Sequence, residues 1–139
     1  MTLYEWIEFY NRKNPQDPFQ PTDGFELFYV PEKGFCEVRF LGDMVIIGQL
    51  AGDARFFKEH VDEVAARLGI REGGTLCVRK AILAYIRLFG YRIVDTEELE
   101  DGTKRYYCAH KETDKWGLAS PGYTYDNTGE LAYLITWEI

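Results

Sequence analysis

The residues best suited to chemistry lie at one junction, where an apolar segment at residues 44–50 passes into an amphipathic segment at residues 54–68. The first segment, MVIIGQL, predicts a strand buried on both faces. In the second, hydrophobic side chains recur at helical spacing, which predicts a helix. A helix that follows a strand directly leaves its first backbone N–H groups unpaired, and such groups attract anions. We therefore expect an anion site at residues 49–55.

Two residues of this junction qualify the expectation. Gly48, in the middle of the predicted strand, indicates a bulge or the close approach of a ligand or another backbone. Asp53 has the residue type and position of a helix N-cap. A capping carboxylate would repel an anion and occupy one of the amides. The alternative interpretation is a tight strand-to-helix turn that binds no ligand.

The composition limits the class of protein. The chain has 139 residues, of which 46% are hydrophobic and 28% charged, and this predicts a single domain over residues 1–139. A net charge of -7 repels nucleic acids and anionic membranes, so neither is expected as a partner. Cys36, Cys77 and Cys108 lie in apolar segments, which favours buried reduced thiols, and no Cys/His spacing suggests a metal site. The lack of a signal layout or a long apolar segment predicts a cytoplasmic location.

Turn residues and periodicity divide the rest of the chain into short elements. Helices are expected at residues 2–13, 54–68 and 79–89, the last largely buried, and strands at residues 25–30, 35–41, 44–50, 75–78, 91–96, 104–110 and 131–139. The first three strands should form an antiparallel meander, and the strand–helix–strand unit after them predicts a parallel pair. The predicted fold class is α/β (α+β), with a mixed, twisted central sheet flanked by helices and an extra C-terminal strand.

Two local patterns within this order resemble the GNAT superfamily of acyl-CoA-dependent N-acyltransferases. The first, QLAGDA from Gln49 to Ala54, fits the family's Q/R-x-x-G-x-G/A loop between a strand and a helix. The second, RKAILAYIRLFGYRIV at residues 79–94, is similar to the family's helix that ends in FYEKLGF and leads into a strand. The resemblance covers residues 25–111.

The resemblance implies acetyl-CoA as cofactor. In the family, loop amides and the helix N-terminus hold the pyrophosphate, and the pantetheine arm pairs with the strand before the loop, where a bulge splays two parallel strands apart. The residues that the resemblance assigns to cofactor binding are Ile46, Ile47, Gln49, Leu50, Gly52, Ala54 and Arg55. Gly52 and Ala54 would be small so that the phosphate can approach the main chain.

The resemblance also implies catalytic residues. Tyr85 is the expected acid that reprotonates the leaving thiolate, and Glu37 or Glu26 the expected acceptor of the amine's proton. Aligned from Gly90, however, Ile86 rather than Tyr85 falls on the family's catalytic tyrosine. The alternatives are a core aromatic for Tyr85 and solvent-facing glutamates.

Two functions follow as expectations. The first is an N-acetyltransferase that moves an acyl group from acyl-CoA to a small-molecule or peptide amine. The second is a non-catalytic binding or assembly module that has lost the cofactor site. The family's opening strand is absent, so we expect the strand at residues 131–139 to fill that edge of the sheet or to pair with another subunit in a homodimer.

Overall fold

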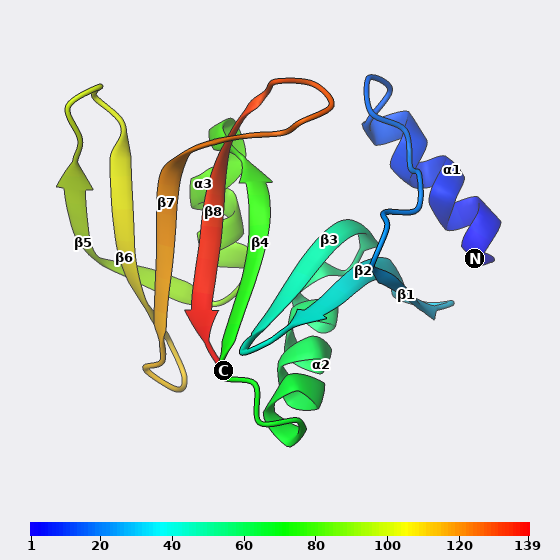
Figure 1. Ribbon diagram of the computed structural model, residues 1–139, viewed down its shortest axis with the longest axis horizontal. Helices are drawn as coiled ribbons and strands as arrows, with labels where there is room; N and C mark the ends of the chain where they lie inside the picture. The colour runs from blue at the N-terminus through cyan, green and yellow to red at the C-terminus, as the bar shows by residue number, and fades with distance from the viewer.

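Eight strands form one mixed sheet in the order β1-β2-β3-β4-β8-β7-β6-β5 in the computed structural model, which describes residues 1–139 (Figure 1). Three α-helices pack against it, so the fold is α+β. The elements are α1 (Leu3–Lys13), β1 (Glu26–Val30), β2 (Gly34–Leu41), β3 (Met44–Gly52), α2 (Ala54–Arg67), β4 (Glu72–Val78), a 3-10 turn (Arg79–Ala81), α3 (Ile82–Leu88), β5 (Tyr91–Glu98), β6 (Lys104–His110), β7 (Trp116–Thr124) and β8 (Leu131–Glu138).

The first two helices begin where their caps predict. The N–H of Glu5 donates to Oγ1 of Thr2 at 3.1 Å, and the N–H of Thr2 donates to Oε1 of Glu5 at 2.9 Å, which completes a capping box on α1. At α2 the N–H of Phe56 donates to Oδ1 of Asp53 at 3.0 Å. The predicted N-cap role of Asp53 is therefore confirmed.

The meander and the parallel pair are also confirmed. β1, β2 and β3 pair antiparallel in sequence order, and β3 pairs parallel with β4 through the α2 crossover. Every other neighbouring pair in the sheet is antiparallel. The one parallel pair thus joins the part of the sheet formed by β1–β3 to the part formed by β4–β8.

The predicted place of the C-terminal strand at an edge is wrong. β8 pairs with β4 on one side and with β7 on the other, in the middle of the sheet. Its alternating pattern explains this position, because Ala132, Tyr133, Ile135 and Trp137 are all buried. The backbone of β8 is therefore used within the chain and offers no free edge to a second subunit.

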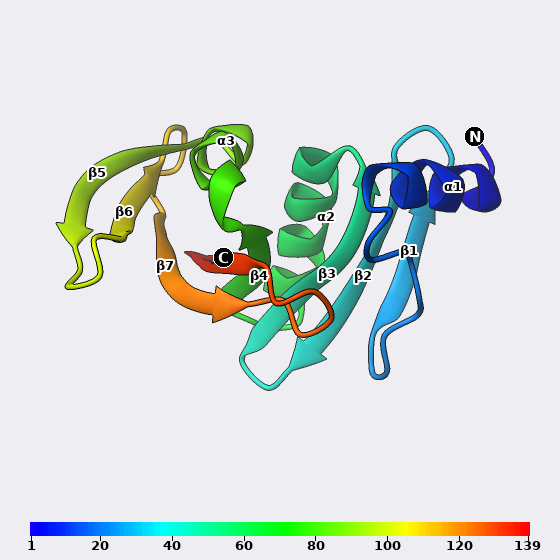
Figure 2. The same ribbon diagram turned by 90° about the horizontal axis from the view of Figure 1, so that it is seen from above.

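The helices lie on different faces of the sheet. Figure 2 shows α2 and α3 together on one side of the curved sheet. Cys36 of β2 belongs to the core cluster that contains Phe57 of α2, whereas the ring of the adjacent Phe35 lies 6.0 Å from Tyr10 of α1. Because neighbouring residues of a strand point to opposite faces, α1 covers the face opposite α2.

Helix α3 is shorter and more exposed than predicted. It has seven residues and follows the 3-10 turn, and only Ile82 and Ile86 are buried. Leu83 and Leu88 are 46% and 44% exposed, so the predicted burial of most of this helix is wrong. Apolar composition alone could not distinguish the contact face from the outer face.

The three cysteines are free and buried, which confirms the predicted unpaired, buried thiols. None of the helices combines the length and the apolar character that a membrane crossing requires.

Candidate functional site

Strands β3 and β4 separate beside the predicted anion site. Their last paired residues are Ile47 and Thr75, although both strands continue beyond this pair. Oγ1 of Thr75 donates to the carbonyl oxygen of Ile47 at 2.8 Å and so closes the end of the ladder. Beyond it the two strands diverge (Figure 1). The main chains of β3 and β4 therefore no longer bond to each other over the second half of each strand.

A bulge in β3 coincides with this separation. Between the pairs Cys36–Leu50 and Val38–Ile47, two residues of β3 oppose one residue of β2. The two residues are Gly48 and Gln49, which confirms the bulge predicted at Gly48. An added Cβ at Gly48 would lie 3.1 Å from the ring of Phe25, so a larger residue there would displace this ring.

The amides of the junction are partly occupied. The N–H of Asp53 donates to the carbonyl oxygen of Lys33 at 2.8 Å, and the Asp53 carboxylate caps Phe56. The first helical hydrogen bond is donated by Phe57 to Asp53, at 3.1 Å. The N–H groups of Ala54 and Arg55 precede this bond and can have no partner within the helix. Two of the predicted anion-binding amides thus remain for a ligand.

The β3 backbone offers further donors. Gly52 lies opposite Gly34 in the antiparallel ladder of β2 and β3. The N–H of the next residue, Asp53, donates to the carbonyl oxygen of Lys33, in the turn before β2. Because amides alternate in direction along an antiparallel ladder, those of Leu50 and Gly52 point away from β2. They face the side on which β4 has diverged.

The charged side chains at the junction are already paired. Lys33 Nζ lies 3.6 Å from Asp53 Oδ2, and the Arg55 guanidinium lies 3.1 Å from Glu59 and 3.8 Å from Glu112. These side chains are all partly exposed to solvent, so their charges are screened. Arg55 does not stand as an isolated cation for an anionic ligand.

Gly52 has a structural requirement that the sequence did not reveal. Its φ is +102°, and an added Cβ would lie 2.0 Å from the carbonyl oxygen of Lys33. Glycine is thus required at this position because the backbone of the turn before β2 lies against it. The position would exclude side chains even without a phosphate.

Glu37 is buried, which corrects the expectation of a solvent-facing glutamate; it is only 3% exposed. Its oxygens accept hydrogen bonds from the Thr22 N–H and hydroxyl, both at 2.8 Å, and from Nε2 of Gln49 at 2.7 Å. Nε2 of Gln49 also donates to the carbonyl oxygen of Gln20 at 2.6 Å. This network ties the loop before β1 to the bulge, so the Gln49 side chain is engaged away from the helix N-terminus. The base role of Glu37 stays a prediction, and Glu26 lies exposed on β1.

The remaining predicted residues divide between the core and the sheet surface. Ile47 is buried in the core cluster, against which Leu50 packs, and Ile46 is half-buried. Tyr85 of α3 is half-buried, with its ring 5.8 Å from that of Phe89. Burial raises the pKa of Tyr85, and the Cys77 thiol raises it further. The helix that carries Tyr85 follows β4 through the 3-10 turn and contacts this strand.

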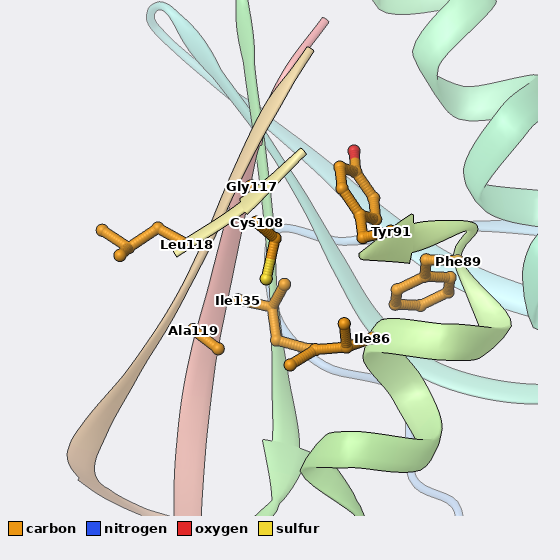
Figure 3. Close-up of a pocket in the computed structure, with 8 residues that line it drawn as sticks. All are labelled: Ile86, Phe89, Tyr91, Cys108, Gly117, Leu118, Ala119 and Ile135. Carbon is orange, nitrogen blue, oxygen red and sulfur yellow. The ribbon is translucent and has the colours of Figure 1, made fainter. Parts of the chain in front are cut away.

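Two hollows lie elsewhere. A cavity of about 10 Å³ lies between α3 and the sheet and is lined almost entirely by apolar side chains. Figure 3 shows the residues that line it, with Leu118 pointing away from the others. This volume is that of about one water molecule, so the cavity belongs to the packing of the core. A surface hollow of about 340 Å³ lies along α2 and is lined mainly by charged residues. The first cannot hold a cofactor, and neither includes Tyr85 or Gln49.

Sequence reasoning missed the environment of Lys58, which borders this surface hollow. Helical periodicity predicts that Lys58 lies on the solvent-exposed face of α2 with the other charged residues, but it is only 4% exposed. Its Nζ lies 2.8 Å from Asp62 Oδ2 and 4.8 Å from the centre of the Trp137 ring. Nε1 of Trp137 donates to the other Asp62 oxygen at 2.8 Å. Only the spacing of Lys58 and Asp62, four residues apart, hinted at this pair.

No group of three or more His, Cys, Asp or Glu side chains is arranged to hold a metal ion. No family model matches the chain, and no match is found among curated proteins.

Proposed function

We propose that this chain is an N-acyltransferase of the GNAT type, which transfers the acyl group of acetyl-CoA to an amine of a small molecule or peptide. The observation that carries the proposal is the divergence of β3 and β4 at the Gly48 bulge, next to the N-terminus of α2. An extended pantetheine arm needs free main-chain donors between two strands, and a pyrophosphate needs free amides at a helix start. Both kinds of donor lie side by side here.

The cofactor would lie along the second half of β3. The outward amides of Leu50 and Gly52 support a role in holding the pantetheine arm, and those of Ala54 and Arg55 a role in holding the pyrophosphate. The acyl end would then reach the α3 side of the gap, where Tyr85 lies. The cofactor supplies the activated thioester, and the chain supplies alignment and proton transfer.

In the proposed transfer, the amine nitrogen attacks the thioester carbonyl carbon, a C–N bond forms and the C–S bond breaks. Glu37 or a water molecule accepts the proton that the nitrogen loses, and the Tyr85 hydroxyl gives a proton to the leaving thiolate. The products are an amide and free coenzyme A.

Asp53 favours the second candidate function, a non-catalytic binding or assembly module of the same fold. Its carboxylate caps Phe56 and lies where the resemblance would put a phosphate. A negative charge there opposes the binding of an anion. The two functions therefore differ in whether coenzyme A binds at this helix N-terminus.

The deciding experiment is thermal unfolding with acetyl-CoA, on the native chain and three variants. A ligand of the folded state stabilises it, by about 2.7 kcal/mol at a concentration 100 times its Kd. We expect acetyl-CoA to raise the melting temperature of the native chain. Asp53→Asn should enlarge the rise, because asparagine keeps the cap and removes the charge. Ala54→Glu should abolish it, since a carboxylate in the first turn suits the helix but repels phosphate.

Asp43→Asn is the matched control, because Asp43 is exposed at the opposite end of β3. It makes the same change of charge and should leave the rise unchanged. If millimolar acetyl-CoA raises the melting temperature of neither the native chain nor Asp53→Asn, the acyltransferase proposal is wrong and the non-catalytic binding module is the remaining candidate.

A further inference from the structure

Strands β4, β8, β7 and β6 are covered by helices on one face only. Figure 2 shows α2 and α3 on the same side of the curved sheet, and α1 contacts β2 and β3 instead. Cys77 of β4 and Ala119 of β7 belong to the core cluster on the helix side. Because neighbouring residues of a strand point to opposite faces, Leu76 and Leu118 point away from the helices, as Figure 3 shows for Leu118.

The uncovered face is apolar across five neighbouring strands. Ladder pairing places Tyr107 of β6 opposite Leu118 of β7, and Leu76 of β4 opposite Leu134 of β8. Ile46 of β3 points to the same face, because it lies between two residues of the core cluster. We call six residues of these strands the open face: Ile46, Leu76, Tyr107, Trp116, Leu118 and Leu134.

Several side chains of the open face are well exposed to solvent. Leu76, Tyr107 and Trp116 are 40%, 39% and 42% exposed, and Trp116 shares its face with Leu118, two residues later. Monomeric proteins rarely expose a continuous apolar patch of this breadth. Aromatic residues are also enriched where proteins contact each other. The open face therefore indicates an interface with another protein surface.

A row of residues across the open face carries opposite charges at its two ends. Trp116 is in the middle of this row, opposite Ala109 of β6, and its N–H donates to Oε1 of Glu138 at 3.2 Å. Ala109 is followed in the row by Arg92 of β5, which lies opposite it. Glu138 of β8 is followed by Glu72 of β4 in the same way. The row thus runs from a carboxylate on β4 to a guanidinium on β5.

Both end charges are available to a partner. Glu72 forms no ion pair within the chain. Nη2 of Arg92 lies 3.3 Å from Oδ1 of Asp114, and both side chains are more than half exposed, so this pair is weak. The net charge of -7 makes two copies of the chain repel each other, except where opposite charges face each other in the contact.

The charges of the row allow it to pair with itself. In the strand order β4-β8-β7-β6-β5, β7 is the middle strand. Rotation of a second copy by half a turn about an axis parallel to β7 lays its β5 over β4 and its β4 over β5. Arg92 of each copy then meets Glu72 of the other. Tyr107 meets Thr136, whose neighbour on β4 is Gly74, so no large side chain opposes the tyrosine ring.

We propose that the open face packs against the open face of a second copy of this chain and forms a twofold homodimer. Leu118 lies near the axis and meets its own copy, and two Arg92–Glu72 ion pairs form at the borders. Two aligned sheets pack about 10 Å apart, and the side chains of their inner faces then interdigitate. The dimer uses side chains of β8 and leaves its backbone paired with β4 and β7.

Sedimentation equilibrium of the full chain tests this contact. We expect the native chain to be a dimer at micromolar concentrations. Arg92→Glu should raise the Kd of the dimer by about 100-fold, because it creates two pairs of like charges in each dimer. Leu118→Arg should raise it at least as much, since it sets two cations against each other near the axis.

Exchange of the two charges is the sharpest test. The double variant Arg92→Glu, Glu72→Arg again places opposite charges together, so its Kd should return to within about threefold of the native value. Glu63→Arg and Arg67→Glu are matched controls, because they reverse the charges of an ion pair on the exposed side of α2. Each control should dimerise as the native chain does, and circular dichroism spectra verify that every variant is folded.

Three outcomes would overturn the proposed dimer. The first is a native chain that sediments as a monomer at every concentration, and the second is an unchanged Kd in Arg92→Glu. The third is a folded double variant that remains as weak a dimer as Arg92→Glu, because the ion pairs would then not join the two copies.

Discussion

Burial raises the pKa of the Tyr85 hydroxyl above the ordinary value of 10.0, so this phenol stays protonated to a higher pH than a solvent-exposed tyrosine. A neutral phenol can give a proton to a thiolate, so its environment suits an acid and not a base. Glu37 has a different environment, with three hydrogen bonds donated to its oxygens by Thr22 and Gln49. These bonds suit it to fixing the bulge.

For Tyr85→Phe we expect the rate of acyl transfer to fall by about 10²–10⁴-fold, the usual contribution of a general acid. In the native chain, any loss of rate caused by ionisation of this acid should begin at a higher pH than it would for a solvent-exposed tyrosine, because burial raises the pKa of Tyr85. Release of free thiol from acetyl-CoA in the presence of a small-molecule amine, followed between pH 6 and 10, measures both the rate and its dependence on pH. Tyr123→Phe is the control. An unchanged rate in Tyr85→Phe would make Tyr85 a core aromatic.

At the scale of the elements, β2 and β3 are held unusually close at the end that leads into α2. An added Cβ at Gly34 would lie 1.9 Å from the Ala51 carbonyl oxygen, and one at Gly52 would lie 2.0 Å from that of Lys33. Both glycines also have positive φ, of +120° and +102°. This contact fixes where β3 ends and therefore where the free amides of α2 begin.

Gly52→Ala should lower the free energy of unfolding by about 2–5 kcal/mol, the sum of left-handed backbone strain and the steric contact. Gly42→Ala is the control, because Gly42 has a φ of +59° and no atom near its Cβ position. It should cost only the strain, about 1–2 kcal/mol. Urea unfolding monitored by circular dichroism measures both losses. Equal losses would contradict the role of the close contact.

At the scale of the whole molecule, the sheet has two parts that share one short parallel ladder. It runs from Met44–Glu72 to Ile47–Thr75. Lys58 adds a second connection between the two parts. It lies on α2, which directly follows β3, and its ammonium lies over aromatic rings of the part formed by β4–β8 and α3. These rings belong to Phe89, Tyr91 and Trp137, at 6.0, 5.2 and 4.8 Å. The proposed cofactor site therefore lies between two parts of the sheet that are joined only where the first halves of β3 and β4 pair.

Lys58→Ala should lower the free energy of unfolding by about 3–5 kcal/mol, because it leaves the largely buried Asp62 carboxylate without its cation. Arg67→Ala removes an ion pair with Glu63 on the exposed side of the same helix. We expect that change to cost about 0–1 kcal/mol. Chemical unfolding of the two variants under identical conditions gives the comparison. Similar losses of unfolding free energy in the two variants would show that Lys58 does not stabilise the contact between the two parts of the sheet.

The sequence alone determined the features that depend on near neighbours in the chain. The caps at Thr2 and Asp53, the bulge at Gly48 and the order of the elements from α1 to β6 follow from periodicity and local hydrogen bonding, and so does the candidate anion site. Periodicity does not predict strand β7. The central place of β8 and the burial of Glu37 and Lys58 are visible only in the folded structure. These features arise from contacts between residues far apart in the chain, and a local pattern carries no information about which distant residue will cover a side chain.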